Sequence, residues 1–207
     1  MQKKAIILDL DNTLFPTSAI GEELFAPLFK LIEENKDFTG DLDTFKQEVM
    51  RRPFQKLAPE YGFSRELTEA GISLLNELQY HKPIATFEDY EALKNYPCRK
   101  FLVTMGFTKM QESKVNNMAI KADFEEVHIV DPELTTQTKK DIFRDIIHRH
   151  GFQLSEVLVV GDDPESEIVA ARELGLDAVV YDKMNFNPGL KNYFRITDFK
   201  ELEKFIV

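Results

Sequence analysis

Four aspartates in this chain follow apolar runs that are typical of buried strands. They are Asp9 and Asp11, after Ala5–Leu8, and Asp162 and Asp163, after Val157–Val160. Carboxylates that gather at one point repel one another, and they stay ionised together when a cation neutralises them. Such oxygen ligands suit Mg²⁺, which favours one or two carboxylates, waters and a phosphate oxygen. These residues therefore predict a magnesium site for phosphate chemistry.

Hydrolysis of a phosphate monoester is extremely slow without a catalyst, so a site of this kind needs a nucleophile and charge neutralisation. An ionised aspartate such as Asp9, beside Mg²⁺, can attack phosphorus and form an aspartyl-phosphate. A second carboxyl two residues away, that of Asp11, can protonate the leaving oxygen and then deprotonate the water that cleaves the intermediate. A lysine and a hydroxyl would hold the phosphoryl group, and Thr104 ends another apolar run.

The elements that must position these residues alternate between strands and helices. The predicted strands are Ala5–Leu8, Lys100–Val103, Val127–Val130, Val157–Val160 and Ala178–Tyr181. The predicted helices between them are a segment through Tyr96 that Thr86 caps, Lys139–His150 and Glu165–Leu174. Continuous apolar runs are typical of parallel strands that are buried on both faces. The alternation predicts an α/β fold with a Rossmann-like, doubly wound parallel sheet, in which ligands bind beyond the carboxyl ends of the strands.

The segment from residue 16 to residue 84 lacks any convincing strand. It predicts four helices, Glu22–Glu34, Leu42–Arg52, Phe54–Tyr61 and Arg65–Tyr80. Ser64 is a good N-cap for the last of them. We therefore expect residues 1–15 and 85–207 to form the catalytic core, and residues 16–84 to form an inserted helical cap that closes over the site.

Four motifs stand in order along the predicted core. They are DLDNTLF at Asp9–Phe15, Thr104 in FLVTMG, a helix-borne lysine, and GDDPESE at Gly161–Glu167. Together they resemble the haloacid dehalogenase superfamily, most of whose members are phosphatases, in its branch with a helical C1-type cap. The resemblance implies that Asp9 is the nucleophile and a metal ligand, and that Asp11 is the acid/base and lends its backbone carbonyl to the metal. It also implies that Thr104 and the lysine hold the phosphoryl group and that Asp162 binds Mg²⁺.

Three positions depart from the pattern of the family. Met105 stands where the family often has Asn, although the resemblance still implies that the backbone of Met105 and Gly106 contacts the substrate. Two adjacent lysines, Lys139 and Lys140, can fill the third motif. We prefer Lys139 because it lies four residues before Phe143, which resembles the short form of this motif in the family. The last acidic position is Glu167, which is expected to complete the metal shell directly or through water, with Asp163 as the alternative.

Other activities of the same scaffold remain open at this point. Carbon–halogen cleavage is disfavoured, because true dehalogenases of the family lack the second aspartate of the first motif. Phosphonate cleavage needs a cap lysine, for which Lys30, Lys36, Lys46 and Lys56 are available. A phosphomutase would keep the same residues, and a non-catalytic phosphate-binding regulatory domain is disfavoured by their retention. Arg51, which with Arg52 ends a predicted helix, either meets the leaving group or stabilises that helix end.

Composition limits the partners. The chain has 207 residues and a formal net charge of −10, without a basic block, so a nucleic-acid backbone is not expected as a partner. No apolar stretch reaches the roughly 20 residues of a membrane span, and one cysteine fits a reducing compartment. We expect a cytoplasmic enzyme acting on a small-molecule phosphate ester such as a sugar phosphate, phosphoglycolate or a nucleoside monophosphate. The sequence leaves the oligomeric state open.

Overall fold

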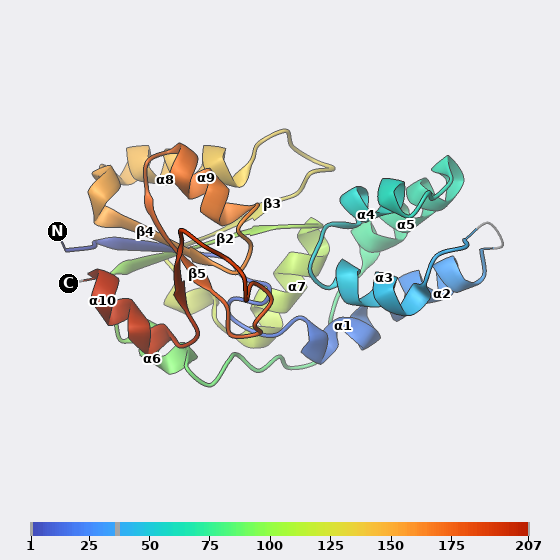
Figure 1. Cartoon of the computed structure of the whole chain (residues 1–207), viewed down its shortest axis with the longest axis horizontal. Coiled ribbons are helices and arrows are strands. Elements are labelled where there is room, and N and C mark those ends of the chain that lie inside the picture. Colours follow the sequence, from blue (N-terminus) through green and yellow to red (C-terminus); the bar gives the residue numbers. More distant parts are fainter. Residues whose placement is uncertain (1, 36–37, 207) are drawn as a thin grey trace.

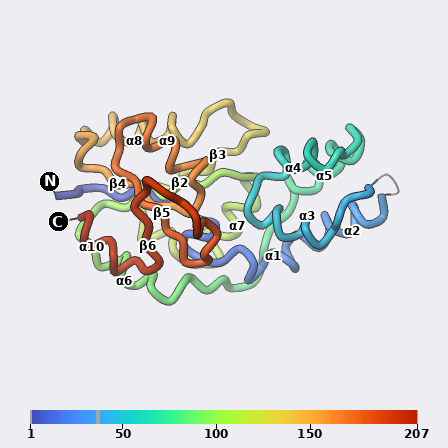
Figure 2. Tube along the Cα trace, in the orientation of Figure 1, coloured from blue at the N-terminus to red at the C-terminus, as the bar shows by residue number. Residues whose placement is uncertain are grey.

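The computed structural model describes residues 2–35 and 38–206, and its centre is one parallel sheet (Figure 1). The strands are β1 (Ala5–Leu8), β2 (Arg99–Met105), β3 (Glu126–Val130), β4 (Val157–Gly161), β5 (Asp177–Tyr181) and β6 (Phe194–Ile196), in the order β3-β2-β1-β4-β5-β6. All neighbouring strands run parallel. The five predicted strands are confirmed. The short edge strand β6, which Figure 2 labels, was not predicted.

Helices cover both faces of this sheet, as the doubly wound prediction requires. The helices α8 (Lys139–His150) and α9 (Glu167–Glu173) cover one face, and α6 (Tyr90–Lys94), α7 (Thr108–Met118) and α10 (Glu203–Ile206) lie on the other (Figure 1). Short 3-10 turns lie between these helices and neighbouring strands, at Lys121–Asp123, Leu154–Glu156 and Phe199–Leu202. Side chains alternate between the faces along a strand, so Ile7 packs under α8 while Ile6 and Leu8 belong to the larger core on the other face. Every residue of β1 is buried.

In the described part of the predicted insertion, five helices lie beyond the carboxyl ends of the strands (Figure 1). They are α1 (Ser18–Leu24), α2 (Ala26–Glu33), α3 (Leu42–Val49), α4 (Phe54–Glu60) and α5 (Arg65–Glu77). A group of aromatic rings fills the space between them, with Phe45 packing edge-on against both Phe54 and Tyr61. The buried apolar residues of these helices are continuous with the larger hydrophobic core, which also contains Leu8 of β1. That these helices form a separate domain stays a prediction.

Several predicted helix boundaries are wrong, and prolines explain two of them. The expected helix Glu22–Glu34 is two helices, because Pro27 lacks a donor and sits near the start of the second. The expected helix Leu42–Arg52 ends at Val49, shortly before Pro53. Thr86 is not a cap, since α6 begins only at Tyr90.

Two other boundaries follow the sequence closely. The predicted cap of α5 is confirmed by the Ser64 hydroxyl, which accepts a hydrogen bond from the Leu67 amide at 3.2 Å. Helix α8 has the predicted bounds, and Gly151 ends it with a φ of 67°. Helix α7 was not predicted at all. Across the described residues, none of the helices has both the length and the apolar character that crossing a membrane requires.

Candidate active site

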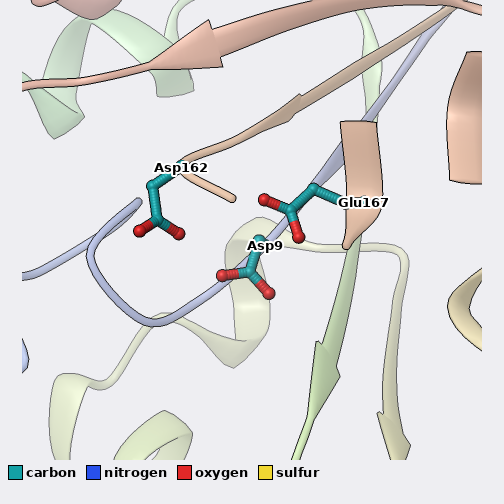
Figure 3. Close-up of side chains that lie close together, drawn as sticks. All are labelled: Asp9, Asp162 and Glu167. Atoms are coloured by element: carbon teal, nitrogen blue, oxygen red, sulfur yellow. The ribbon is translucent and has the colours of Figure 1, made fainter. Parts of the chain in front are cut away.

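Three carboxylates meet beyond the carboxyl ends of the two central strands. Asp9 follows β1, Asp162 follows β4, and Glu167 is the first residue of α9. Figure 3 shows their side chains pointing toward one another. One oxygen from each lies within 4.8 Å of the others. Parallel strands explain the meeting of Asp9 and Asp162, because neighbouring carboxyl ends share one edge of the sheet.

Gly161 gives Glu167 access to this cluster. A Cβ on Gly161 would stand 2.1 Å from the Glu167 Oε1 atom, which no real side chain allows. The same Oε1 accepts a hydrogen bond from the Asp163 amide at 2.8 Å, so the loop after β4 wraps around the carboxylate. The Asp163 carboxylate instead accepts from the Glu165 amide. Of the two candidates for the last acidic position, the structure thus brings Glu167 into the cluster.

Lys139 lies between two of the carboxylates. Its Nζ atom is 2.6 Å from Asp9 Oδ1 and 2.8 Å from Glu167 Oε2, and only 5% of the residue is exposed. A capping box between Thr138 and Asp141 starts α8 at Lys139 and so aims it at the strand ends. Lys140 points elsewhere, to Glu173. The structure therefore brings the preferred lysine, and not its neighbour, to the carboxylates.

Burial and mutual repulsion shape the ionisation of this cluster. Burial, together with the nearby Glu167 charge and against the pull of Lys139, raises the pKa of Asp9 to about 7. Burial and the charges of Glu167 and Asp9 raise the pKa of Asp162 well above its usual value. Burial lowers the pKa of Lys139, but its two carboxylate partners outweigh that effect and raise it overall. The carboxylates thus lack sufficient positive charge around them.

A divalent cation fits this deficit. Asp9, Asp162 and Glu167 carry three negative charges when ionised, and Lys139 supplies one positive charge, which leaves two to neutralise. All three ligand groups offer oxygen atoms, and hard oxygen donors suit Mg²⁺ rather than softer metals. The chemistry of the donor set therefore fits a hard divalent cation such as Mg²⁺.

Asp11 belongs to a second, separate charge pair. Lys114 Nζ lies 2.7 Å from Asp11 Oδ1, and Gln111 Nε2 lies 2.8 Å from Asp11 Oδ2. The Thr17 hydroxyl donates a third hydrogen bond at 3.2 Å. Burial alone would raise the pKa of Asp11, but the Lys114 charge and these hydrogen bonds hold it below the usual value. The pKa of Asp11 is therefore lowered, whereas the pKa of Asp9 is raised.

Gln111 also joins Asp11 to the predicted phosphate-binding strand end. Its amide nitrogen lies 2.6 Å from the Thr104 hydroxyl oxygen and 3.3 Å from the Met105 carbonyl. Gly106, with a φ of 149°, leaves room for Gln111, because a Cβ there would stand 3.2 Å from two of its carbons. The Gly106 amide donates to the Val130 carbonyl at 3.0 Å, so in this structure its hydrogen bond goes to the protein backbone.

One cavity connects these groups with the helices beyond the sheet. The predicted residues Asp9, Asp11, Thr104, Met105, Gly106, Lys139, Asp162, Glu167 and Arg51 all line it. Arg51 lies in the turn after α3, and its guanidinium stacks on the Phe186 ring with 3.9 Å to the centroid. Arg52 instead pairs with Glu60. Apolar side chains such as Phe25, Phe54 and Phe107 form much of the remaining wall.

The fold is a Rossmann-like α/β fold, and a cluster of carboxylates lies at one edge of its sheet. A family model described as haloacid dehalogenase-like hydrolase matches residues 3–175. The chain belongs to the haloacid dehalogenase-like hydrolase family, and within it the chain is a phosphohydrolase.

Two relatives and a solved structure match most or all of the chain. Enolase-phosphatase E1 of Aquifex aeolicus is 25% identical over 224 residues, which cover 97% of this chain and 99% of that protein. Glyceraldehyde 3-phosphate phosphatase of Methanopyrus kandleri is 25% identical over 197 residues, which cover 85% and 82%. The crystal structure of the HAD-hydrolase YfnB from Bacillus subtilis, 18% identical, shares the fold with a TM-score of 0.65 and covers 100% of this chain and 99% of its own.

Proposed function

We propose that this protein is a Mg²⁺-dependent phosphatase that hydrolyses a small phosphate monoester through an aspartyl-phosphate on Asp9. One observation carries the proposal. Asp9 lies in hydrogen-bond contact with a buried lysine and beside two further carboxylates, in the cavity that Asp11 also lines. A nucleophile, a cation site and an acid/base group are the parts that this reaction needs.

In the first step, an Asp9 oxygen attacks phosphorus and the bond from phosphorus to the leaving oxygen breaks. Asp11 gives its proton to that oxygen, and the alcohol departs. Lys139 and the Thr104 hydroxyl hold the oxygens of the phosphoryl group, and Lys139 also keeps Asp9 in place at 2.6 Å. Support for this assignment comes from the match to the first three motifs of the family.

In the second step, water attacks the phosphorus of the aspartyl-phosphate, and the Asp11 carboxylate takes its proton. Inorganic phosphate leaves and Asp9 is restored. Burial would raise the pKa of Asp11, but the Lys114 charge and the hydrogen bond from Gln111 lower it overall. The lowered pKa favours the ionised form that this step requires. The first step instead uses the protonated form of Asp11, which the proton taken from water in the second step regenerates.

Asp9, Asp162 and Glu167, with the Asp11 backbone carbonyl that the family resemblance implies, would hold the metal. When bound, Mg²⁺ supplies neutralisation of the carboxylates and of the phosphoryl charge. The B. subtilis HAD-hydrolase with the same fold has a crystal structure bound to magnesium, which supports the choice of ion.

The helices of residues 16–84 are proposed to act as a cap that encloses the leaving group. Two contacts support this: Asn12 Nδ2 donates to the Met50 carbonyl at 3.3 Å, and Gln55 donates to Glu133 at 2.9 Å. Arg51, at the cavity wall, is proposed to meet the leaving group. The names of the two relatives, a glyceraldehyde 3-phosphate phosphatase and an enolase-phosphatase, support a small phosphorylated metabolite as substrate.

Two alternatives use the same scaffold. A phosphonatase needs a cap lysine at the reacting carbon, but neither Lys30, Lys46 nor Lys56 lines the cavity, and Lys36 lies outside the described residues. A phosphomutase would share every residue of the proposed mechanism, so it is separated by its product. It returns an isomerised ester where a phosphatase releases inorganic phosphate.

The test is a panel of phosphate esters, including glycerol phosphate, glyceraldehyde 3-phosphate and nucleoside monophosphates, assayed with Mg²⁺ and with EDTA. We expect release of inorganic phosphate with Mg²⁺ and a loss of at least about a hundred-fold with EDTA, because the carboxylates then repel the phosphate. Chromatography of the same reactions detects an isomerised ester. Undiminished turnover in EDTA would contradict the proposed role of the metal.

Mg²⁺ should also stabilise the fold, and more so at higher pH. The pKa of Asp9 rises from 3.8 to about 7 on folding without metal. Between these values the folded chain keeps a proton that the unfolded chain has lost, so the free energy of unfolding falls as the pH rises. Mg²⁺ needs the ionised carboxylates, and so its gain in melting temperature should be larger at pH 8 than at pH 6. At a hundred times its Kd the gain is about 2.7 kcal/mol.

Two matched variants sharpen this measurement. Asp162→Asn should lose most of the Mg²⁺ gain, because it removes a ligand. Asp163→Asn should keep most of it, since that carboxylate accepts from the Glu165 amide outside the cluster. Equal losses in the two variants would argue against the proposed ligand set.

A further inference from the structure

A buried lysine outside the four motifs touches the proposed acid/base. Lys114 projects from α7, and only 3% of the residue is exposed. Its ammonium lies 2.7 Å from Asp11 Oδ1. Within residues 2–35 and 38–206, Asp11 is the one group that accepts a hydrogen bond from it. Burial of an ammonium is costly unless it is paired, so this contact calls for an explanation beyond packing.

Gln111 holds the other oxygen of the same carboxyl. It lies on α7 one turn before Lys114, it is 1% exposed, and its amide stands 2.8 Å from Asp11 Oδ2. The Thr17 hydroxyl adds a contact to Oδ1. Both oxygens of Asp11 are therefore fixed by donors from α7 and from the chain after β1. Few conformations of this side chain satisfy all three donors.

We infer that Lys114, assisted by Gln111, is a positioning residue that holds the Asp11 carboxyl where it exchanges a proton with the leaving oxygen. The inference rests on the proposed function and assigns a new role within it. Proton transfer requires donor and acceptor within hydrogen-bond reach, and a carboxyl free to rotate is seldom in that position. Lys114 acts through Asp11 and contributes no bond to the phosphoryl group.

This role predicts a loss that depends on the leaving group. Phenyl phosphate and 4-nitrophenyl phosphate have similar shapes, but phenolate is the poorer leaving group and gains more from protonation. The ratio kcat/KM covers the steps up to departure of that group. A general defect of the fold or of phosphate binding lowers both values equally, whereas misplacement of Asp11 lowers the phenyl phosphate value more.

The experiment measures kcat/KM for both esters with Mg²⁺ in the wild type, Asp11→Asn, Lys114→Met and Lys114→Arg. We expect Lys114→Met to reduce the phenyl phosphate value at least about tenfold more than the 4-nitrophenyl phosphate value, in the direction of Asp11→Asn. Lys114→Arg keeps a charged donor and should restore part of the difference. In Gln111→Met, one neutral side chain is replaced by another of similar length. This variant should show the same selective loss even if Lys114→Met folds poorly.

Lys100→Met is the matched control. Lys100 is also a buried lysine, 9% exposed, and it does not line the cavity. Among the described residues, its ammonium donates only to the Lys94, Tyr96 and Cys98 carbonyls. Its loss should leave the ratio of the two values unchanged. Equal reductions for both esters in folded Lys114→Met and Gln111→Met would overturn the inference while leaving the phosphatase proposal intact. A wild type without Mg²⁺-dependent turnover, or an Asp9→Asn variant that keeps it, would instead overturn the proposed function.

Discussion

Asp9→Asn is expected to abolish phosphate release, with kcat lower by at least about a thousand-fold. An asparagine amide keeps the shape of the side chain but is a poor nucleophile, and it cannot carry the charge that pairs with Lys139 at 2.6 Å. The measurement is Mg²⁺-dependent release of inorganic phosphate from 4-nitrophenyl phosphate. Acid quenching followed by mass spectrometry should detect a phosphorylated wild-type protein and none in the variant.

Asp145→Asn provides the control for this loss. Asp145 is exposed on α8 and pairs with Arg149 at 2.7 Å, away from the cavity. Exposed pairs of this kind contribute little, so its turnover should match the wild type. Retention of turnover in Asp9→Asn, or a phosphorylated residue other than Asp9, would end the proposed mechanism.

The second large effect is expected from Lys139→Met. Removing this ammonium leaves Asp9 and Glu167 without their shared buried partner, so metal-free protein should lose about 3 kcal/mol of unfolding free energy. With Mg²⁺ present, kcat should still fall by about a hundred-fold or more, because a charged donor to the phosphoryl group is gone. Chemical denaturation and phosphate release measure the two effects separately.

Lys140→Met tests the same chemistry at the neighbouring position. Lys140 is part-exposed and pairs with Glu173 at 2.8 Å, so its loss should change stability by less than about 1 kcal/mol and leave kcat unchanged. A larger loss of activity in Lys140→Met than in Lys139→Met would reverse the assignment of the lysine motif.

The fold was predictable where local signals agreed with the tertiary structure. Apolar runs such as Ala5–Leu8 are buried on both faces of the sheet. A continuous apolar run is typical of such a strand, so it could be recognised in the sequence. Helix α8 was predicted to the residue because apolar periodicity and Gly151 marked its course and end. The rule for parallel sheets then brought Asp9 and Asp162 to one edge without any knowledge of distances.

Helix α7 was missed because half of its buried residues are polar. Gln111, Ser113 and Lys114 are buried on it, and they break the apolar periodicity by which a helix is recognised in a sequence. These residues are buried because they serve Asp11 and neighbouring loops, which a one-dimensional pattern cannot reveal. The available signal was a helix-compatible stretch with a glutamine and a lysine three residues apart, between two predicted strands.

The surroundings of Arg51 were also beyond the sequence. Its stacking on Phe186 joins the turn after α3 to a loop that follows β5, and no local pattern links those segments. That loop is itself tied to the cluster, because Asn187 Nδ2 donates to the Asp162 carbonyl at 2.9 Å. Contacts between distant segments depend on the finished packing, so they can be found only in three dimensions.

The central place of β1 sets the order in which the molecule can assemble. Ala5 pairs with Arg99 on one side and with Val157 on the other, so β1 is synthesised well before both of its partner strands. The helices α1 to α5 depend on contacts closer in sequence and can pack sooner. Until Val157–Gly161 has been synthesised, one side of β1 therefore has no partner strand, and the carboxylates of Asp9 and Asp162 can come together only after β4 has joined the sheet.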